Sequence, residues 1–500
     1  MQESGYVTIK RQDQRPTTVP FAATPAGQPP TIKAWANPSV WTERMLTTLE
    51  EGVGGGRWHT LIDKVFSRRN LFDAARRVIG NQGVAGVDHV DVKSFESKLG
   101  EELDKLTETL RTDTDRPQAI PRVWIPKPGS PEKRPLGIPT VRDRVVQTAL
   151  LNVIEPIFDQ TFHDHSYGFR HGRGCQQALK QVESLLNDGY VYVVDADLKS
   201  YFDTIPHDQL MDHVRTKISD SRMLRLIEMF LQQGILDELS FWTPEEGTPQ
   251  GAVISPLLAN LYLNPLDHLV AEAGFPMVRY ADDFVILCRT SEEAVQILET
   301  VKAWVASNGL TLHPTKTKIV DVRTDSFDFL GYHFYGAIRS PRKKSLGKVK
   351  DTVRAKTKRT NGDSLEFIIA RLNTTLRGWF TYFRDCLSSL SSQRVPRLGR
   401  VYPRPSRQYS AETVQATRTR SRKGSSAMAQ RLLSSPGALQ LKRCPCGLLS
   451  ILFQVKLLTG EPDAGNPPVR FGGRGGWNQP AFPTPIGPLL VAGSLAEYSP

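Results

Sequence analysis

The sequence contains few cysteines and no long hydrophobic run. Five of its 500 residues are Cys, widely scattered until Cys444 and Cys446, which argues against a disulfide scaffold and predicts a reduced, cytoplasmic protein. No stretch is long and apolar enough to span a bilayer, and the N-terminus lacks the apolar segment of a signal peptide. We therefore expect a protein with no membrane partner.

Acidic residues are too few to balance the basic ones. The chain has 64 Lys and Arg against 52 Asp and Glu, which gives a net charge of +12. This excess favours a polyanionic partner such as nucleic acid, although charge alone is equally compatible with a basic protein that has no such partner. A chain of 500 residues exceeds what one hydrophobic core usually organises, so several domains are expected.

Composition divides the chain into three parts. The first, residues 1–56, is rich in Pro, Thr, Ala and Gln and ends in three glycines, which predicts a flexible extension. The second runs from Arg57 to about Asp385 and interleaves helices with antiparallel strands, which predicts an α+β fold. Its helical spacing and short β-rich runs occur at residues 141–158, 190–195, 223–231, 277–280 and 284–288. After Cys386, Ser, Arg, Pro and Gly dominate and the periodicity disappears.

Two β-prone segments carry acids at their ends. In residues 278–287, VRYADDFVIL, two apolar runs flank Asp282 and Asp283, which predicts a hairpin with two carboxylates at its tip. An Asp pair in a hairpin can also be ordinary turn chemistry, since Asp tolerates turn geometry. The second segment, residues 191–198, is a strongly β-prone run that ends in acids, including Asp197.

An acid at the end of a buried strand is costly unless it is paired or holds a metal. If the two strands lie side by side, Asp197 comes near Asp282 and the two make a site for hard divalent cations, which take oxygen ligands. Two such ions can clamp the attacking and leaving oxygens of an in-line phosphoryl displacement. The acids therefore indicate phosphoryl-transfer chemistry.

The YADD hairpin, preceded by D-x-x-x-x-F after a strand, resembles the palm of reverse transcriptases. The resemblance implies a right-hand fold of fingers, a palm with an antiparallel sheet backed by helices, and a helical thumb. It implies that Asp197, Asp282 and Asp283 are catalytic and bind two Mg²⁺ ions. It also makes Phe202 the side chain that excludes a ribose 2′-OH, whereas the alternative for Phe202 is a core aromatic.

Further blocks follow in the order of the same family, at residues 83–88, 125–128, 133–140, 166–170, 247–251, 255–260, 310–318 and 329–332. By this resemblance, Lys127 and Arg134 reach the nucleoside triphosphate, and Gln250 contacts the incoming nucleotide and the template. Taken alone, the two cations could simply be solvated on an exposed loop. The implied substrates are an RNA template, a DNA primer and dNTPs.

The segment after the palm is strongly basic. Clustered cations neutralise phosphates, so we expect RNA binding there, at Arg342, Lys343, Lys344, Lys348 and Lys350. Residues 372–384, LNTTLRGWFTYFR, resemble the start of the thumb of group II intron maturases, which implies intron RNA as a partner and a role in splicing and mobility. Trp379 and Phe383 stand at helical spacing and are interpreted as core. An RNA-binding splicing cofactor with little catalysis is the competing hypothesis, and the intact acids argue against it.

The expected domains are therefore fingers over residues 57–189, palm over 190–337, and a basic linker with the start of the thumb over 338–385. The segment 386–500 does not continue the basic helices of the family. Cys444 and Cys446 are not expected to form a metal site, since two ligands fall short of the usual four. No H-N-H endonuclease pattern is visible in this reading frame.

A shifted reading frame restores family-like sequence in this tail. Back-translated with degenerate codons and read one nucleotide out of frame, it permits FPDLDGYIRGRL from Val395 and HQRWPNAF from Ser425, strings typical of maturases after the YFR motif. We therefore expect a frameshift between about Arg384 and Val395, and a disordered tail. A damaged and inactive copy is accordingly a third hypothesis.

Overall fold

The computed structural model describes residues 30–126, 133–238, 240–358, 361–383 and 386. The N-terminal lobe consists of α1 (Ile32–Trp35), α2 (Glu43–Glu51), the 3-10 turn η1 (Gly54–Gly56), α3 (Ile62–Val65), α4 (Arg68–Gly80), α5 (Val92–Ser97), α6 (Leu99–Arg111), β1 (Ile120–Pro126), β2 (Lys133–Gly137) and α7 (Val141–Asp159). Most side chains of α7 are buried, and α4 packs along it, so α7 is the centre of this lobe. The Thr140 hydroxyl begins α7 by accepting a hydrogen bond from the Asp143 amide at 3.0 Å.

The central part of the chain builds an antiparallel sheet with the strand order β6-β7-β3-β8. Its elements are α8 (Cys175–Asn187), β3 (Tyr192–Asp197), the 3-10 turn η2 (Tyr201–Asp203), α9 (His207–Arg215), α10 (Ser221–Leu231), β4 (Ile235–Asp237), β5 (Ser240–Trp242), α11 (Ser255–Glu272), β6 (Met277–Tyr280), β7 (Asp283–Cys288), α12 (Ser291–Ser307) and β8 (Lys318–Asp321). Helices α8, α11 and α12 contact this sheet. The α+β right-hand palm expected from the sequence is thereby confirmed.

The two faces of this sheet enter different cores. Val194 and Phe284 lie in the main core with side chains of α11 and α12, whereas Val193 and Val285 lie in a second core with α8. Successive side chains of a strand point to opposite faces. Asp197 and Asp283, on the same strands, therefore share the face of Val193 and Val285.

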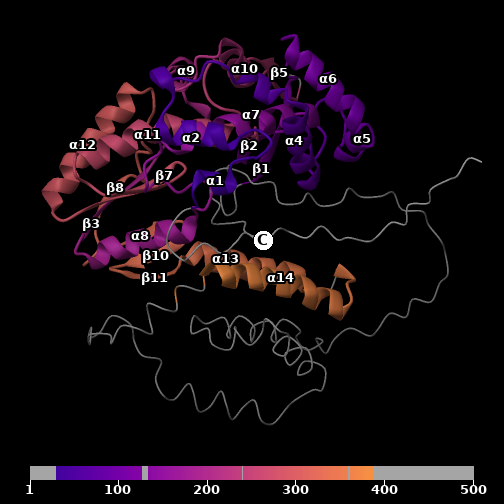
Figure 1. The fold of residues 1–500 in the computed structure, drawn as a ribbon. Coiled ribbons are helices and arrows are strands. Elements are labelled where there is room, and N and C mark those ends of the chain that lie inside the picture. Colours follow the sequence, from indigo (N-terminus) through magenta and orange to yellow (C-terminus); the bar gives the residue numbers. More distant parts are fainter. Residues whose placement is uncertain (1–29, 127–132, 239, 359–360, 384–385, 387–500) are drawn as a thin grey trace, which may run out of the picture.

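The C-terminal described part forms a layer of its own beneath α8 (Figure 1). It comprises β9 (Ser326–Phe329), β10 (Tyr332–Tyr335), β11 (Ile338–Pro341), α13 (Lys343–Lys356) and α14 (Leu365–Phe383). The Tyr382 hydroxyl donates to the Leu330 carbonyl at 2.7 Å, and the buried ring of Phe383 lies 4.9 Å from that of Tyr332. Trp379 packs against the same core, so these aromatics fasten the thumb helix to the palm.

The flexible N-terminal extension expected over residues 1–56 is wrong for residues 30–56. Trp41 and Leu46 are buried there, and the Trp41 indole donates to the Asn152 carbonyl in α7 at 3.0 Å. The ring of Trp41 also meets that of Trp58 edge to face at 5.6 Å. The free energy gained by burying these apolar side chains holds the segment in place, although its overall composition is polar.

No helix in the described part of the chain is both long and apolar enough to cross a membrane. The tail expected to be out of frame lies outside the described residues, as do Cys444 and Cys446, except that Cys386 itself is buried against the second core.

Candidate active site

The YADD segment forms a tight hairpin at one end of the sheet. Tyr280 and Asp283 are paired in the register of β6 and β7, so Ala281 and Asp282 make the turn between them. Ala281 has a φ of +58°, in the left-handed region that a non-glycine residue seldom adopts. Asp197, the last residue of β3, is the direct partner of Asp283 on β7. The structure thus brings the three predicted acids to the same end of the sheet.

The carboxyl groups of this hairpin have raised pKa values. Burial raises the pKa of Asp282, and the nearby Asp197 raises it further. Burial also raises the pKa of Asp283 well above its usual range, and the charges of Asp282, Asp195 and Asp197 add to the shift. A cluster of carboxylates that disfavour their own charged forms is typical of a site that gains from a bound cation.

Three basic side chains from three different parts of the chain lower the pKa values of these acids. Arg134 on β2 and Lys316, in the loop before β8, both lower the pKa of Asp282. Arg342, which directly precedes α13, lowers that of Asp283. Arg134 was predicted to face the site, whereas Lys316 was not singled out, and Arg342 was predicted as an RNA contact on the surface.

The donor set suits a hard divalent cation, because it consists of carboxylate oxygens. In the described residues, however, no three His, Cys, Asp or Glu side chains are gathered closely enough to hold an ion as they stand. One oxygen of the Asp197 carboxylate also accepts a hydrogen bond from the Lys316 ammonium at 2.5 Å. An ion that binds this oxygen would therefore compete with the Lys316 ammonium.

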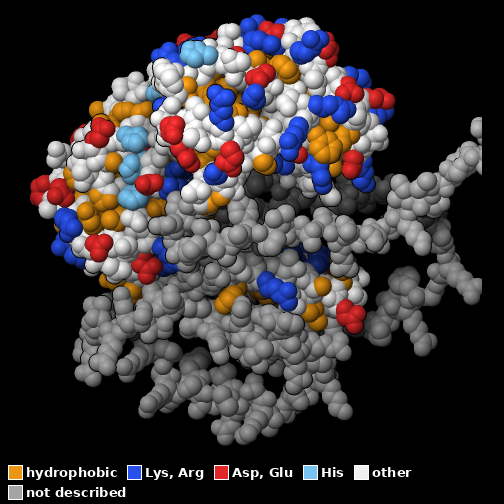
Figure 2. All heavy atoms as spheres, viewed as in Figure 1, with side chains coloured by type: hydrophobic (Ala, Val, Ile, Leu, Met, Phe, Trp, Pro, Cys, Tyr) orange, Lys and Arg blue, Asp and Glu red, His pale blue; other side chains and the backbone are white. Residues whose placement is uncertain are grey.

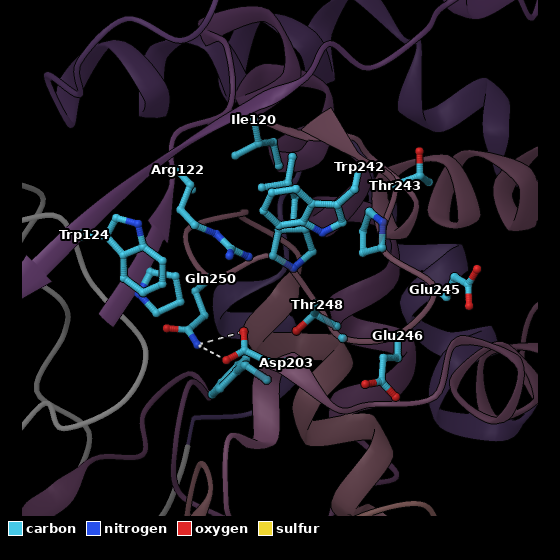
Figure 3. Close-up of a pocket in the computed structure, with 17 residues that line it drawn as sticks. Ile120, Arg122, Trp124, Asp203, Trp242, Thr243, Glu245, Glu246, Thr248 and Gln250 are labelled. Atoms are coloured by element: carbon cyan, nitrogen blue, oxygen red, sulfur yellow. Dashed lines mark hydrogen bonds between the residues drawn. The ribbon is translucent and has the colours of Figure 1, made fainter. Parts of the chain in front are cut away.

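A pocket of about 500 Å³ opens between β1, β2, β5 and the loop before α11 (Figure 3), and none of the three acids lines it. Phe202 and Gln250, both predicted to contact the nucleotide, line it. Phe202 is only 5% exposed and belongs to the main core, so it is both a core aromatic and part of the pocket wall. Gln250 donates to both carboxylate oxygens of Asp203, at 3.2 and 3.3 Å, as the dashed lines in Figure 3 show.

The glycines around Gln250 are required by backbone contacts. Gly247 has a φ of +87°, and a Cβ there would lie 2.9 Å from the Phe202 carbonyl oxygen. The Thr248 amide donates to that same oxygen at 2.6 Å, and the Gly137 amide of β2 donates to the Gln250 carbonyl at 2.6 Å. This loop therefore ties the wall residue Phe202 to the fingers hairpin.

The predicted RNA contacts divide into two groups. Lys343 and Lys344 are exposed on α13, while Lys348 and Lys350 are partly buried on the same helix. Lys127 lies outside the described residues. In the view of Figure 2, basic and acidic side chains are mixed over the lobe of α4–α6, so that face presents no single basic patch.

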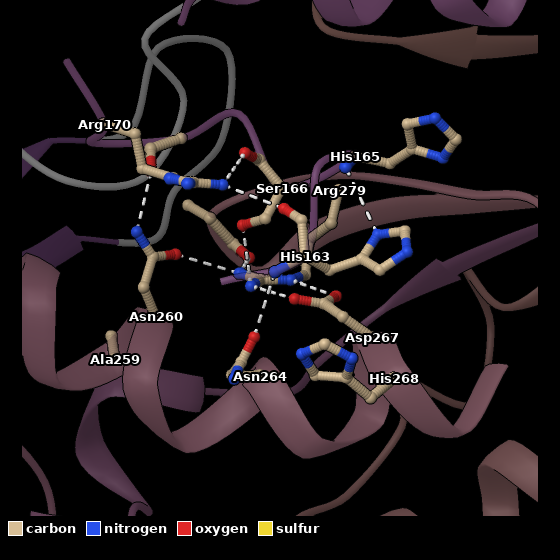
Figure 4. A network of polar contacts seen from close by, with 12 residues as sticks. His163, His165, Ser166, Arg170, Ala259, Asn260, Asn264, Asp267, His268 and Arg279 are labelled. Atoms are coloured by element: carbon tan, nitrogen blue, oxygen red, sulfur yellow. Dashed lines mark hydrogen bonds and ion pairs between the residues drawn. The ribbon is translucent and has the colours of Figure 1, made fainter. Parts of the chain in front are cut away.

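Arg279, in β6, was not among the predicted site residues. Its guanidinium is the centre of a buried polar network with partners on α11 and in the loop before α8 (Figure 4). An arginine directly before YADD at a strand position of a buried sheet would have been the available signal, since a buried charge needs partners.

Comparison with known proteins identifies two regions. Residues 125–334 match the reverse transcriptase (RNA-dependent DNA polymerase) family, and residues 346–398 match the group II intron maturase-specific domain. The second match runs past Val395, and the frameshift stays a prediction.

Curated relatives agree with these matches. Protein YkfC of Escherichia coli K12 is 35% identical over 54% of this chain and 82% of its own length. The group II intron-encoded protein LtrA of Lactococcus lactis subsp. cremoris is 36% identical over 42% of this chain and 36% of its own length. An uncharacterized 91 kDa protein in the cob intron of Schizosaccharomyces pombe is 32% identical over 46% of this chain and 35% of its own length. The chain thus spans most of the first relative and about a third of the other two.

A palm hairpin with its acids beside the last residue of β3, followed by a maturase-specific segment, places the chain in one family: it belongs to the group II intron reverse transcriptases and maturases.

Proposed function

We propose that this chain extends a DNA primer on an RNA template by two-metal nucleotidyl transfer. The observation that carries the proposal is the direct pairing of Asp197 with Asp283 across β3 and β7, next to Asp282 at the hairpin tip. Asp197 and Asp282 would be the principal ligands of two Mg²⁺ ions, with Asp283 as the third acid. Ions bound there would activate the primer 3′-hydroxyl and stabilise the leaving pyrophosphate.

The chain's own side chains then position the nucleotide. The charge of Arg134 lowers the pKa of Asp282, and its guanidinium would pair with a triphosphate held at the acids. Phe202 lines the pocket between β1, β2 and β5 and would exclude a ribose 2′-OH by its bulk. Gln250, tied to β2 through its backbone, lines the same pocket and would contact the base pair. Lys127 is proposed as a second contact to the triphosphate.

We further propose that α13 binds group II intron RNA and so supports splicing and mobility. Lys343 and Lys344 are exposed in the first turn of this helix, and the match to the maturase-specific domain begins two residues later, at Leu346. The proposed substrates and partners are therefore intron RNA, an RNA template with a DNA primer, and dNTPs.

Template-primer extension with Mg²⁺ tests the polymerase proposal on two purified proteins. One is the chain as written, and the other has its reading frame restored after Arg384. Extension by both would show that fingers and palm suffice, and extension by the restored protein alone would identify this chain as a damaged copy of an active enzyme. If neither protein extends a primer while both bind RNA, the polymerase proposal fails and the RNA-binding function replaces it.

A further inference from the structure

Arg279 and Arg339 are the largest fully buried side chains in the described part of the molecule. Arg279 stands on β6, three residues before Asp282, and its side chain is 0% exposed. Its guanidinium makes a two-pronged ion pair with Asp267 of α11, with Nε 2.7 Å from one carboxylate oxygen and Nη2 2.5 Å from the other. Asp267 is itself only 3% exposed. The pair is therefore removed from water on both sides.

The guanidinium of Arg279 also donates to three further residues. Nη1 donates to the Asn260 side-chain oxygen at 2.9 Å and to the Ala281 carbonyl at 2.9 Å, and Nη2 donates to the Ser166 hydroxyl at 2.8 Å. Figure 4 shows these partners converging on the guanidinium from α11 and from the loop that carries Ser166. The contact with Ala281 is the one that bears on function, because Ala281 immediately precedes Asp282.

The backbone of the hairpin is held from the same side. The Tyr167 amide donates to the Arg279 carbonyl at 2.9 Å. Gly168 lies so close beneath the turn that a Cβ there would come within 3.2 Å of the Ala281 Cα. Asn260, which accepts from Arg279, also donates to the Gly168 carbonyl at 2.7 Å. The turn at Ala281, with its unfavourable φ of +58°, is thus held between Gly168 and the guanidinium.

Stability alone does not account for this arrangement. A buried ion pair is often no more stabilising than well-packed apolar side chains of similar volume, because both charges lose their hydration. An apolar pair at positions 267 and 279 would fill the same space without that cost. What an apolar pair could not do is hold the Ala281 carbonyl by a hydrogen bond.

We propose that Arg279, oriented by Asp267, is a positioning residue that fixes the carbonyl of Ala281 and thereby aims the Asp282 carboxylate at the divalent cation. Arg279 does not touch the substrate and acts through the turn. This inference rests on the proposed function, since it assumes that Asp282 is a metal ligand.

The test uses the full chain and three variants. The double variant R279M/D267L removes both charges together, so no unpaired charge is buried and the fold should be kept. R279K keeps a charge for Asp267 but loses the planar fork that reaches Ala281. S166A is the control, because it removes a different partner of the same guanidinium.

The first readout is the affinity for Mn²⁺ alone, followed by electron paramagnetic resonance, with D282N defining the signal of this site. The second is the split between kcat and KM for dNTP in primer extension, with the thermal midpoint recorded for each protein. We expect R279M/D267L and R279K to bind Mn²⁺ about tenfold more weakly and to lose kcat more than KM, while S166A changes Mn²⁺ affinity less than threefold.

Wild-type Mn²⁺ affinity in a folded R279M/D267L protein would overturn the inference. If the double variant does not fold, R279K decides the matter. An R279K protein that unfolds would overturn the inference because the role of Arg279 would then be structural. An R279K protein that binds Mn²⁺ normally would overturn it because Arg279 would then have no positioning role. Failure of the proposed function has a different signature. In that case the wild-type chain itself shows no Mn²⁺ signal that depends on Asp282, or binds the ion without extending a primer.

Discussion

The Nζ atom of Lys316 lies 2.5 Å from a carboxylate oxygen of Asp197, so a lysine ammonium and a metal ion would compete for the same ligand. The two side chains are 60% and 26% exposed, and an ion pair of this kind is worth about 1 kcal/mol or less. We therefore expect K316A to bind Mn²⁺ more tightly, by up to about fivefold. A metal titration measures this, with K302A as control because Lys302 forms an exposed pair with Glu299 on α12. Unchanged or weaker binding by K316A would show that the ammonium does not compete.

Phe202 belongs to the main core and also lines the pocket. A smaller side chain at this position distinguishes its effect on stability from its effect on nucleotide selection. F202V should incorporate ribonucleotides at least tenfold better relative to deoxyribonucleotides, because the shorter side chain leaves room for a 2′-OH. It should also lower the thermal midpoint, since Phe202 is buried. F202Y keeps the bulk and should keep the discrimination. If F202V incorporates ribonucleotides and deoxyribonucleotides with equally reduced efficiency, Phe202 has only a structural role in the core.

The exposed lysines of α13 are the accessible part of the proposed RNA surface. K343S/K344S should weaken RNA binding and flatten the salt dependence, by about 0.7 in the slope of log K against log salt for each lysine that contacts a phosphate of single-stranded RNA. Fluorescence anisotropy at several salt concentrations gives both quantities. K93S/K98S changes two exposed lysines at the two ends of α5 and serves as the matched control. Equal slopes for the two variants would remove α13 from the RNA interface.

The raised pKa of Asp143 makes the stability of the folded chain depend on pH. Burial raises its pKa from 3.8 to about 6, although its carboxylate accepts hydrogen bonds from the Gln118 amide and the Gln233 side chain. Because the folded-state pKa lies above the ordinary value, the native state loses stability as pH rises through the interval between them.

Asn at position 143 is uncharged throughout this range. The difference in free energy of unfolding between D143N and wild type should therefore shift in favour of the variant between pH 4 and pH 7, by about 3 kcal/mol at most. Urea unfolding at a series of pH values measures the difference. A difference that does not change with pH would mean that Asp143 titrates normally in the folded chain.

Local patterns were sufficient to predict the hairpin and its neighbour strand. The acids at the ends of two β-prone runs come together because β3 and β7 are antiparallel and in register over six residues, from Tyr192–Cys288 to Asp197–Asp283. The helices that back the sheet follow from the same periodicity. These features depend on residues within one strand or helix, which is where sequence patterns are informative.

The polar network and the charges around the acids could not be predicted in this way. Arg279 donates a hydrogen bond to Ser166, 113 residues away in the sequence, and Lys316 donates one to Asp197, 119 residues away. Arg342 belongs by composition to the basic stretch after the palm, yet in the folded chain its charge lowers the pKa of Asp283. Each of these contacts depends on how distant elements pack. The same holds for Trp41, which is buried against α7, so that the predicted flexible extension was wrong for its segment.

Asp282 is the residue on which the account depends most directly. Single-turnover primer extension on an RNA template with Mg²⁺ should be compared for wild type, D282N and D321N, the last being an acid at the opposite end of the same sheet, where it pairs with Tyr192. We predict that D282N loses at least a thousandfold in rate while its RNA affinity and thermal midpoint stay within error of wild type, and that D321N remains active. Extension by D282N at the wild-type rate would contradict the assignment of Asp197, Asp282 and Asp283 as the catalytic metal site.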